Sequence, residues 1–456
     1  MTEYDLIVLG AGPGGYTAAA SAASRGMKTL LVEKGLSGGT CLNRGCIPTK
    51  ALLYCAERYA EARSGEAFGV TASVGPFDYA KAAAHRDGVM KRLRGGVDFL
   101  VKRAGAERFV GEAELVDENR VKVGEETFGF KNLIIATGSI PAPPPFTFDP
   151  NANLINSDAF LSMNEIPESV VIIGGGVIGM EFATILAKIG RKVTVVEAFE
   201  RILPPMDAES AQIIRRRLEK EGVKFQTQAF VKKVEKQGEK TVCAVESLDE
   251  RFALEADLVI CAVGRIAHTK TLQVQRLGLA MRKSFIQVDD RCMTSVPHIY
   301  AVGDVNGRSM LAHAAMFQGE KAVENIYYGI DQPILSAPVP ACVYTDPEIA
   351  SVGLTRDAAI IAGYEVRVGR VDAVANGKML TAGAREGFVQ LVADAKSGKI
   401  LGCQMATPRA TDMIAQVALA IKLGATATHI ADTIHPHPTI SEMVADAAKG
   451  IRREGE

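Results

Sequence analysis

The sequence contains no tryptophan, few aromatic residues and almost no net charge. Aromatic residues make up 6% of the 456 residues, and 52 Lys and Arg are balanced by 53 Asp and Glu. Such a balance creates no field that would attract nucleic acid or an anionic lipid surface. The missing tryptophan matters only for spectroscopy. The 47% hydrophobic and 23% charged residues are the ordinary mixture of a globular protein. We therefore expect a folded protein that binds neither nucleic acid nor a membrane.

Long uninterrupted hydrophobic runs are also missing. The longest run, residues 170–190, contains Glu181 and Lys188 and is rich in glycine, so it does not indicate a membrane span. The first fifteen residues have early acids and no basic segment ahead of an apolar core. A signal peptide would need that basic segment, so we expect none.

Cysteines are few and mostly scattered. Of the eight, Cys41 and Cys46 form the one close pair. Scattered thiols in a long chain favour a reducing cytosol, where a close pair is more often catalytic than structural. At about 150 residues per domain the chain has room for roughly three domains, so its fold needs neither disulfides nor a structural metal. We expect a cytoplasmic protein with no metal site.

A strand, a glycine-rich turn, a helix and a second strand ending in an acid occur twice. The first copy starts at residues 5–9 and ends with Thr29–Glu33, and the second starts at residues 170–173 and ends with residues 192–197. Glu33 follows Gly10, and Glu197 follows Gly174, by the same 23 residues. This equal spacing predicts two dinucleotide-binding sites.

The glycines of such a turn have separate steric roles. The first allows a tight bend, the second lets the backbone approach a pyrophosphate, and the third lets the helix pack on the strand. The phosphates bind N–H groups at the helix N-terminus, and the acid accepts a hydrogen bond from a ribose hydroxyl. Plain packing is the alternative, but the shared pattern favours cofactor binding in both copies. Glu197 favours NAD over NADP, a preference that the nearby Arg201 weakens.

Further strands complete the expected fold. Buried strands are expected at residues 133–138, 258–264 and 299–304, and residues 141–145 are a proline-rich linker. Beyond about residue 336 the pattern changes to that of an α+β domain. Its expected strands and helices are residues 339–352, 365–371, 388–393 and 400–405, then Ala410–Leu423 and residues 441–449.

The close cysteine pair lies in the motif GGTCLNRGCIPTK, soon after the first acid. Two cysteines five residues apart can form a disulfide in a small ring, and a thiolate near a helix N-terminus is stabilised by the helix dipole. Pro48 predicts a helix that starts near Ala51. Two buried free thiols or two metal ligands are the alternatives, but no further Cys or His lies nearby at ligand spacing. The redox interpretation is favoured.

With these motifs the chain resembles the flavin-dependent pyridine nucleotide–disulfide oxidoreductases. The resemblance covers nearly the whole chain and is closest to the members that oxidise dihydrolipoamide. It implies an α/β fold with two Rossmann-like dinucleotide-binding domains and a C-terminal α+β dimerisation domain. The implied ranges are 1–145 for the first part of the FAD-binding domain, 146–266 for the NAD-binding domain, 267–335 for the second, central part of the FAD-binding domain, and 336–456 for the dimerisation domain.

The activity implied by the resemblance is the oxidation of protein-bound dihydrolipoamide to lipoamide with reduction of NAD. A redox-active disulfide between Cys41 and Cys46 would pass the electrons to FAD and on to NAD. The implied partners are a second copy of the chain and the lipoyl domains of acyltransferase subunits of 2-oxo acid dehydrogenase complexes, or the H protein of glycine cleavage. The alternatives are another NAD(P)H-dependent disulfide reductase of the family and a cofactor-binding subunit without turnover.

Residues 435–442 resemble the family's catalytic-base segment. By resemblance, His437 of the partner subunit accepts a proton and Glu442 orients it, which makes the homodimer obligatory. The segment from Thr439 to Glu442 also fits a capping box, in which Glu442 would only satisfy backbone groups at a helix start. His435 is the competing candidate for the base. The cysteine pair favours the catalytic interpretation.

Other positions are assigned by the resemblance. Lys50 resembles the lysine beside the flavin ring and Glu181 its ion-pair partner, although Lys50 could instead be a solvated helix residue. Asp304 resembles the acid on the ribityl chain and could instead cap a strand end, and His313 alone would more often be a packed core residue. The implied FAD-binding residues are Gly10, Gly12, Gly14, Gly15, Glu33, Lys34, Gly39, Thr40, Lys50, Ala113, Thr137, Gly138, Ser139, Asp304, Met310, Leu311, Ala312 and His313. The implied NAD-binding residues are Gly174, Gly176, Val177, Ile178, Gly179, Glu181, Glu197, Val231 and Gly264.

The sequence departs from the family pattern at three places, which together comprise five residues. Arg44 lies between the cysteines, where a small apolar residue is common. Residues 266–268 read Ile-Ala-His in place of Arg-Pro-Asn, and Ala314 replaces a lysine. We expect these departures to affect NAD affinity and the charge preference for the substrate, while the thiols, the flavin site and the base stay intact.

Overall fold

The structure is a computed structural model that describes residues 2–248 and 250–451. Its chain divides into two compact units that alternate along the sequence. Unit 1 comprises Met1–Pro145, Ile155–Ile166 and Val263–Ser336, and unit 2 comprises Phe146–Leu154, Pro167–Ala262 and Ala337–Glu456. The first glycine-rich turn and the cysteine pair belong to unit 1, and the second turn and residues 435–442 belong to unit 2.

Unit 1 is built on a sheet whose parallel part has the order β3-β2-β1-β6, with β20 paired to the C-terminal half of β6. Leu6, Ile7 and Val8 in the central strand are fully buried. A continuous apolar run is typical of a parallel strand that is covered on both faces. The strands are β1 Thr2–Leu9, β2 Thr29–Glu33, β3 Glu107–Val110, β6 Glu126–Ile135 and β20 Ile299–Ala301.

An antiparallel part extends the same sheet, because β4 and β5 pair with each other and β5 pairs with the N-terminal half of β6. Two short antiparallel pairs, β17 with β7 and β18 with β19, lie outside it. The strands of these parts are β4 Ala113–Asp117, β5 Arg120–Val123, β7 Ser139–Pro141, β17 Arg265–Ala267, β18 Met281–Arg282 and β19 Phe285–Ile286.

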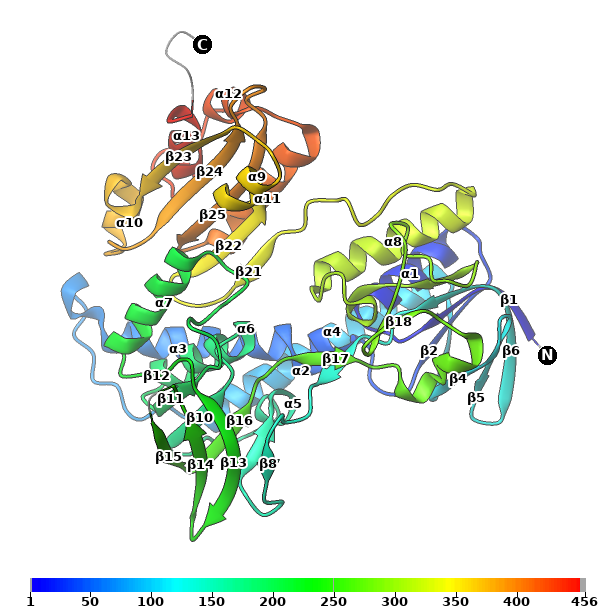
Figure 1. Cartoon of the computed structure of the whole chain (residues 1–456), viewed down its shortest axis with the longest axis horizontal. Coiled ribbons are helices and arrows are strands. Elements are labelled where there is room, and N and C mark those ends of the chain that lie inside the picture. The colour runs from blue at the N-terminus through cyan, green and yellow to red at the C-terminus, as the bar shows by residue number, and fades with distance from the viewer. Residues whose placement is uncertain (1, 249, 452–456) are drawn as a thin grey trace. The chain divides into compact units, whose positions relative to one another are not determined.

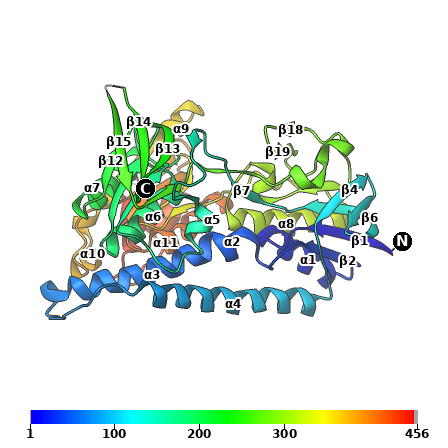
Figure 2. The same ribbon diagram turned by 90° about the horizontal axis from the view of Figure 1, so that it is seen from below.

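Helices pack on the sheet of unit 1. Helices α1 and α8 lie against each other (Figure 1), so closely that a Cβ on Gly319 would be 2.4 Å from the backbone oxygen of Gly14. Helices α3 and α4 run side by side (Figure 2). The helices are α1 Pro13–Ser24, α2 Gly39–Arg44, α3 Cys46–Arg63, α4 Tyr79–Ala104, α5 Ser157–Phe160 and α8 Ala312–Tyr328.

A buried arginine explains why the detached segment Ile155–Ile166 belongs to unit 1. The side chain of Arg86 on α4 is 2% exposed. Its guanidinium donates to the backbone oxygen of Met163 at 2.8 Å and to the side chain of Asn164 at 3.2 Å, and its Nε bonds the Asp87 carboxylate at 2.8 Å. A buried cation needs such partners, so these bonds fix the segment to the helix.

The first half of unit 2 repeats the plan of unit 1. A parallel sheet contains β12-β11-β10-β16 in that order, and the antiparallel strands β15-β14-β13 with β8 form a second sheet. The shared core includes Val171, Val196, Val234 and Val259. The elements are β8 Thr147–Phe148, β9 Leu154–Asn156, β10 Ser169–Ile173, α6 Val177–Lys188, β11 Lys192–Val196, α7 Ala208–Lys220, β12 Lys224–Gln226, β13 Phe230–Gln237, β14 Lys240–Glu246, β15 Arg251–Ala256 and β16 Leu258–Cys261.

The C-terminal half of unit 2 is an antiparallel sheet of order β21-β22-β25-β24-β23, packed against helices. The expected single strand at residues 339–352 is wrong: the chain forms two strands that turn back at Tyr344–Pro347, where a proline cannot continue the ladder. The elements are β21 Ala341–Val343, β22 Glu348–Gly353, α9 Arg356–Ile361, β23 Val366–Asp372, α10 Gly377–Thr381, β24 Phe388–Asp394, β25 Ile400–Thr407, α11 Ala410–Leu423, α12 Ala427–Ala431 and α13 Glu442–Lys449.

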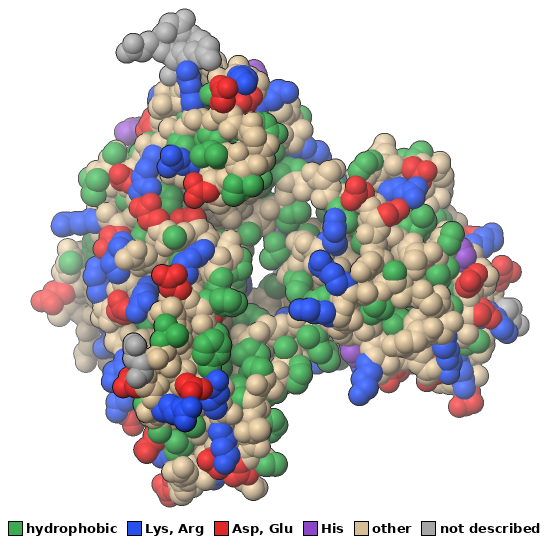
Figure 3. All heavy atoms as spheres, viewed as in Figure 1, with side chains coloured by type: hydrophobic (Ala, Val, Ile, Leu, Met, Phe, Trp, Pro, Cys, Tyr) green, Lys and Arg blue, Asp and Glu red, His purple; other side chains and the backbone are tan. Residues whose placement is uncertain are grey.

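Short 3₁₀ turns connect several elements. They are Gly65–Phe68, Lys270–Leu272, Val274–Leu277, Gly303–Asn306 and Ala373–Ala375. Among the described residues, no helix has the length and apolar character that a membrane crossing requires. Basic and acidic side chains are interspersed over the face drawn in Figure 3.

Candidate active site

The first glycine-rich turn, between β1 and α1, has no room for side chains at two positions. Gly10 has φ +99°, and a Cβ there would be 2.5 Å from the backbone oxygen of Ala136. A Cβ on Gly15 would be 1.7 Å from the backbone oxygen of Gly10. These contacts are the tight bend and the close helix–strand packing that a dinucleotide-binding turn needs.

The middle of this turn is packed against α2, the short helix that contains Cys41. A Cβ on Gly39, the first residue of α2, would be 2.5 Å from Cα of Gly12, and Gly39 has φ +57°. Gly12 is the N-cap of α1 and has extended dihedral angles, φ −72° and ψ −178°. A Cβ on Gly12 would be 3.8 Å from Cα of Gly39, an ordinary contact, so the close approach depends on Gly39.

The second turn, between β10 and α6, has the same construction. Gly174 has φ +111°, and a Cβ on Gly179 would be 2.0 Å from the backbone oxygen of Gly174. Gly176 caps α6 with φ −73° and ψ −174°, which matches Gly12. A Cβ on Gly176 would have no atom within 4 Å, so the backbone here faces open space that a pyrophosphate could occupy.

Both predicted acids are held in the same way. One oxygen of Glu33 accepts the N–H of Ala11 at 2.7 Å, and the other accepts the N–H of Gly35 at 2.8 Å. Glu197 repeats this with the N–H groups of Gly175 at 2.5 Å and Phe199 at 2.8 Å. The repeat that the 23-residue spacing predicted thus extends to individual hydrogen bonds.

The predicted ribityl and strand-end positions come together in unit 1. Ser139 donates to the Asp304 carboxylate at 2.6 Å, and Arg265 donates to the hydroxyl of Ser139 at 2.8 Å. The Thr137 hydroxyl is buried and has no hydrogen-bond partner in the described part of the chain. Burial raises the pKa of Asp304, and the bond from Ser139 opposes this. A buried hydroxyl without a partner is what a polar cofactor would complete, and with the half-buried Asp304 carboxylate it fits FAD.

Arg265 connects Ser139 and Asp304 to helix α2, a role that the sequence did not indicate. Its guanidinium also approaches the Thr40 hydroxyl at 3.4 Å and forms an ion pair with Asp158 on α5 at 3.1 Å. Arg44 lies 3.9 Å from the same carboxylate. The sequence does not indicate that Asp158 pairs with these arginines, because Asp158 is remote in sequence from both and belongs to no motif.

The predicted start of the cysteine-bearing helix near Ala51 is wrong. Helix α3 starts at Cys46, and Cys41 lies inside the preceding short helix α2. Gly45 is the residue between them, with φ −148° and ψ −110°. Pro48 is the third helical residue, where the missing N–H has no partner to lose. Cys46 is therefore closer to the positive helix end than expected, and its thiolate is stabilised there.

The thiols of Cys41 and Cys46 are hydrogen-bonded to each other. The hydrogen bond with the Cys46 side chain, together with burial, raises the pKa of the Cys41 thiol far above its usual range, and the charge of Lys50 acts in the opposite direction. The position of Cys46 at the N-terminus of α3 favours a thiolate there, which suits Cys46 as the leaving group.

Residues His437 and Glu442 form a hydrogen-bonded pair in unit 2. Nδ1 of His437 lies 2.9 Å from one oxygen of Glu442, and the other oxygen accepts the N–H of Thr439 at 2.8 Å. The bond from the Thr439 N–H lowers the pKa of Glu442 most, and the bond with His437 lowers it further. The predicted capping box from Thr439 to Glu442 forms only by this half, because the N-cap is Ser441 and the Thr439 hydroxyl donates to the backbone oxygen of Pro436. Glu442 thus bonds both the backbone ahead of the helix and the histidine. Because an ionised carboxylate only accepts, Nδ1 carries the proton and Nε2 has a free lone pair.

The competing histidine has both ring nitrogens engaged. Nδ1 of His435 contacts the backbone oxygen of Thr433 at 2.9 Å, and Nε2 contacts the Gln416 side chain at 3.3 Å. The side chain of His437 is 80% exposed, and its Nε2 contacts none of the described residues within hydrogen-bonding distance. This geometry favours His437 as the base.

The remaining predicted positions are distributed over both units. Lys50 lies on α3 of unit 1, whereas Glu181 is buried in α6 of unit 2 and accepts the N–H of Tyr344 at 3.1 Å. Their ion pair stays a prediction. Met310 and Leu311 precede α8, which starts with Ala312 and His313, while Ala113 starts β4, Val231 lies in β13, and Gly264 has φ +119°.

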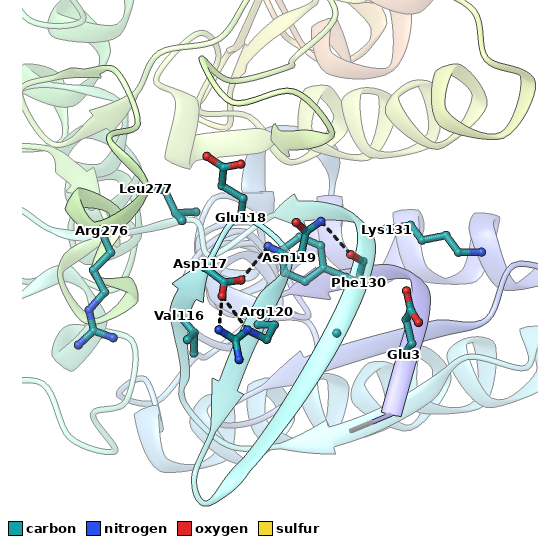
Figure 4. Close-up of a pocket in the computed structure, with 11 residues that line it drawn as sticks. Glu3, Val116, Asp117, Glu118, Asn119, Arg120, Phe130, Lys131, Arg276 and Leu277 are labelled. Atoms are coloured by element: carbon teal, nitrogen blue, oxygen red, sulfur yellow. Dashed lines mark hydrogen bonds and ion pairs between the residues drawn. The ribbon is translucent and has the colours of Figure 1, made fainter.

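The pocket drawn in Figure 4 contains none of the predicted site residues. It has a volume of about 690 Å³ and lies at the β4–β5 turn, where Asp117 is paired with Arg120. In the described chain, no group of three or more His, Cys, Asp or Glu side chains is arranged to hold a metal ion.

Two dinucleotide-binding turns and a dithiol in one chain define a class, the flavoprotein disulfide oxidoreductases. The sequence model of the pyridine nucleotide-disulphide oxidoreductase family matches residues 4–319, and that of its dimerisation domain matches residues 339–448. The chain belongs to this family, whose members use FAD and a pyridine nucleotide. The matching dimerisation domain indicates a homodimer.

Full-length relatives include dihydrolipoyl dehydrogenases. The chain is 41% identical to the dihydrolipoyl dehydrogenase of Geobacillus stearothermophilus, with 98% of this chain and 96% of the relative covered. It is 41% identical to dihydrolipoyl dehydrogenase 2 of Haloarcula marismortui, with 99% and 98% covered. Among solved structures, the HOCl-induced flavoprotein disulfide reductase RclA from Escherichia coli has a TM-score of 0.87 at 26% identity, with 98% and 100% covered. The resemblance to this family and the fold that it implied are confirmed.

Proposed function

We propose that the protein oxidises the dihydrolipoyl group of a carrier domain and reduces NAD. The observation that carries this proposal is the cysteine pair itself. Cys41 and Cys46 flank the junction of α2 and α3, and α2 is packed against the first dinucleotide turn through Gly39. A dithiol fixed to a cofactor turn is suited to exchange with a substrate dithiol.

The exchange proceeds in two sulfur displacements. A substrate thiolate attacks Sγ of Cys41, which forms a mixed disulfide and breaks the Cys41–Cys46 bond, and Cys46 leaves as a thiolate. The second substrate thiol then attacks the substrate sulfur of the mixed disulfide, releases the cyclic disulfide lipoamide and leaves Cys41 reduced. Two electrons pass from the substrate to the cysteine pair. Bound FAD supplies the two-electron transfer from this dithiol to the nicotinamide.

A base is needed because the thiol is a weak nucleophile until it loses its proton. Nε2 of His437, supplied by the partner subunit, takes the proton of the substrate thiol. Glu442 keeps the proton of the imidazole on Nδ1 and stabilises the imidazolium that forms, as carboxylates do beside catalytic histidines.

FAD is assigned to the first turn and NAD to the second. The unsatisfied Thr137 hydroxyl and the half-buried Asp304 carboxylate support FAD in unit 1. In unit 2, Glu197 repels a 2′-phosphate and accepts a 2′-hydroxyl. Arg201 does not offset this, because its guanidinium donates to the backbone oxygens of Leu203 and Pro204 at 3.1 and 2.9 Å. These contacts support NAD over NADP.

The partners proposed are lipoyl domains of acyltransferase subunits in 2-oxo acid dehydrogenase complexes, or the lipoyl-bearing H protein of glycine cleavage. Support comes from the relatives, which are dihydrolipoyl dehydrogenases. The scattered cysteines, with a single close pair, support a reducing cytoplasm as the site of action.

Mixing the purified holoprotein with free dihydrolipoamide and NAD tests this function. We expect NADH to form, with NADP reduced far more slowly. Cys46→Ser should keep FAD but lose turnover and the long-wavelength absorbance that appears on partial reduction, whereas Cys55→Ser, a control thiol outside the pair, should retain both. Bound FAD with no turnover in the unmodified protein would contradict the proposal, and an unchanged band in Cys46→Ser would remove Cys46 from its assigned role.

The base is tested separately. His437→Gln should lower kcat by at least about a hundredfold, because general-base catalysis contributes that much. His435→Gln should change kcat only slightly, since the ring of His435 is engaged on both sides. The opposite ranking would assign the base to His435.

A further inference from the structure

The departure at residues 266–268 places a histidine in unit 1, beside the site assigned to FAD rather than to NAD. His268 follows β17, and its backbone N–H donates to the backbone oxygen of Gly138 at 2.9 Å. This position indicates an effect of the departure on flavin binding, in addition to the effect on NAD affinity expected from the sequence.

His268 belongs to a cluster of three side chains. Nε2 of His268 lies 3.3 Å from Nζ of Lys34, and Nζ of Lys34 lies 3.1 Å from an oxygen of Glu112. Lys34 directly follows β2, and Glu112 directly precedes β4. Three segments that are far apart in sequence are thus joined through one lysine.

Each member of the cluster is next to a residue assigned to FAD. Lys34 is itself assigned and adjoins Glu33, the ribose-binding acid. Glu112 adjoins Ala113, the backbone contact of the adenine, and His268 is bonded to Gly138. We propose that Lys34, Glu112 and His268 form a clamp that retains the adenosine end of FAD, and that protonation of His268 loosens it. This inference rests on the proposed assignment of FAD to the first turn.

The charges around His268 explain why protonation would loosen the clamp. Lys34 and Arg44 are the cations that face the imidazole, and Glu112 and Glu33 are the acids. Burial lowers the pKa of His268 below its usual range, and the positive charge of Lys34 lowers it further. The neutral ring accepts a hydrogen bond from the Lys34 ammonium, whereas a protonated ring would place two cations 3.3 Å apart.

The sign of the pH effect follows. Because the folded protein disfavours protonated His268, the contact is complete at neutral pH. It is lost when the pH falls below the usual histidine range. Since Lys34 and Glu112 are about half exposed, the contact is worth only a modest factor in affinity.

Release of FAD from the purified holoprotein tests the clamp. The holoprotein is diluted into buffers from about pH 7.5 to 5, and the rise of flavin fluorescence gives the release rate. We expect release to become about two- to fivefold faster across the histidine titration. His268→Asn should lack this acceleration, because its amide can still accept from Lys34 but does not titrate. Lys34→Met should release FAD faster at every pH.

His85→Asn is the matched control, because His85 is an exposed histidine on α4 of the same unit. It should keep the pH profile of the unmodified protein, and circular dichroism at each pH shows whether the fold is intact. An unchanged acid acceleration in His268→Asn, with FAD bound, would overturn the clamp alone. A protein that binds no FAD would overturn the assignment of FAD and with it the proposed function.

Discussion

The two glycine-rich turns share their hydrogen bonds but differ in their surroundings. In both, the acid accepts two backbone N–H groups and the third glycine touches the backbone of the first. In unit 1, however, the middle of the turn is packed on Gly39 of the cysteine helix, whereas Gly176 in unit 2 faces open space.

This difference matches two kinds of cofactor use. A turn that is packed on helix α2 and flanked by the cluster of Lys34, Glu112 and His268 is suited to a cofactor that stays bound. A turn with nothing against its middle glycine is suited to a nucleotide that binds and leaves in each cycle. On the proposed assignment of FAD and NAD, one motif serves two purposes, and the packing of α2 on the first turn separates them.

The largest effects should come from the glycine that packs each helix on its strand. Gly15→Ala places a Cβ 1.7 Å from the Gly10 oxygen, and Gly179→Ala places one 2.0 Å from the Gly174 oxygen. Each should lower the free energy of unfolding by about 3 kcal/mol or more. Gly15→Ala should be purified without FAD, and Gly179→Ala with FAD but without NAD reduction, as visible absorbance and turnover will show. The comparison fails if the two variants lose the same cofactor.

Gly39, which packs on the middle glycine of the first turn, and Gly176, the middle glycine of the second turn, should separate the two turns more sharply. Gly39→Ala should move α2 off Gly12 and lower turnover with dihydrolipoamide by about a hundredfold, since a displaced reacting group costs that much. Gly176→Ala should leave Tm unchanged, because its Cβ meets no atom within 4 Å. It should instead raise KM for NAD by about tenfold through contact with the pyrophosphate. Equal loss of thermal stability in both variants would contradict the difference in packing.

The acid of the second turn should control the choice of nucleotide. Glu197→Gln removes the charge that repels a 2′-phosphate and should raise the ratio of kcat/KM for NADP over NAD by about tenfold. Arg201→Ala should change this ratio by less than about twofold, because its guanidinium is bonded to backbone oxygens. Glu33→Gln should leave the ratio unaltered and weaken FAD binding instead. A large effect of Arg201→Ala would mean that this arginine contacts the nucleotide.

The smallest effect is expected at Asp304 in the protein without FAD. Burial raises the pKa of Asp304, so the folded apoprotein gains stability as the pH falls through that raised pKa and carries an unfavourable charge above it. Asp304→Asn removes this charge and keeps an acceptor for Ser139. Its apoprotein should melt about 1–2 °C higher at neutral pH and bind FAD more weakly. A lower Tm would mean that the carboxylate stabilises the fold.

Local patterns carried much of the fold and the site. The spacing from Gly10 to Glu33, repeated from Gly174, predicted both turns, because the steric demands of a dinucleotide turn are local. The helix start at Cys46 and the break at Pro347 were missed although both signals are local, since a proline fits a first helical turn as well as a loop. Asp158 and His268 act through long-range contacts that no local pattern indicates.

A thiol count on the holoprotein tests the central claim, that Cys41 and Cys46 form the bridge that takes electrons from the substrate. The chain has eight cysteines, so a bridge between two of them leaves six that react with a thiol reagent in denaturant. The account predicts six reactive thiols in the oxidised protein and eight after reduction with dihydrolipoamide. Eight in both states, or the same rise in Cys41→Ser, would contradict it.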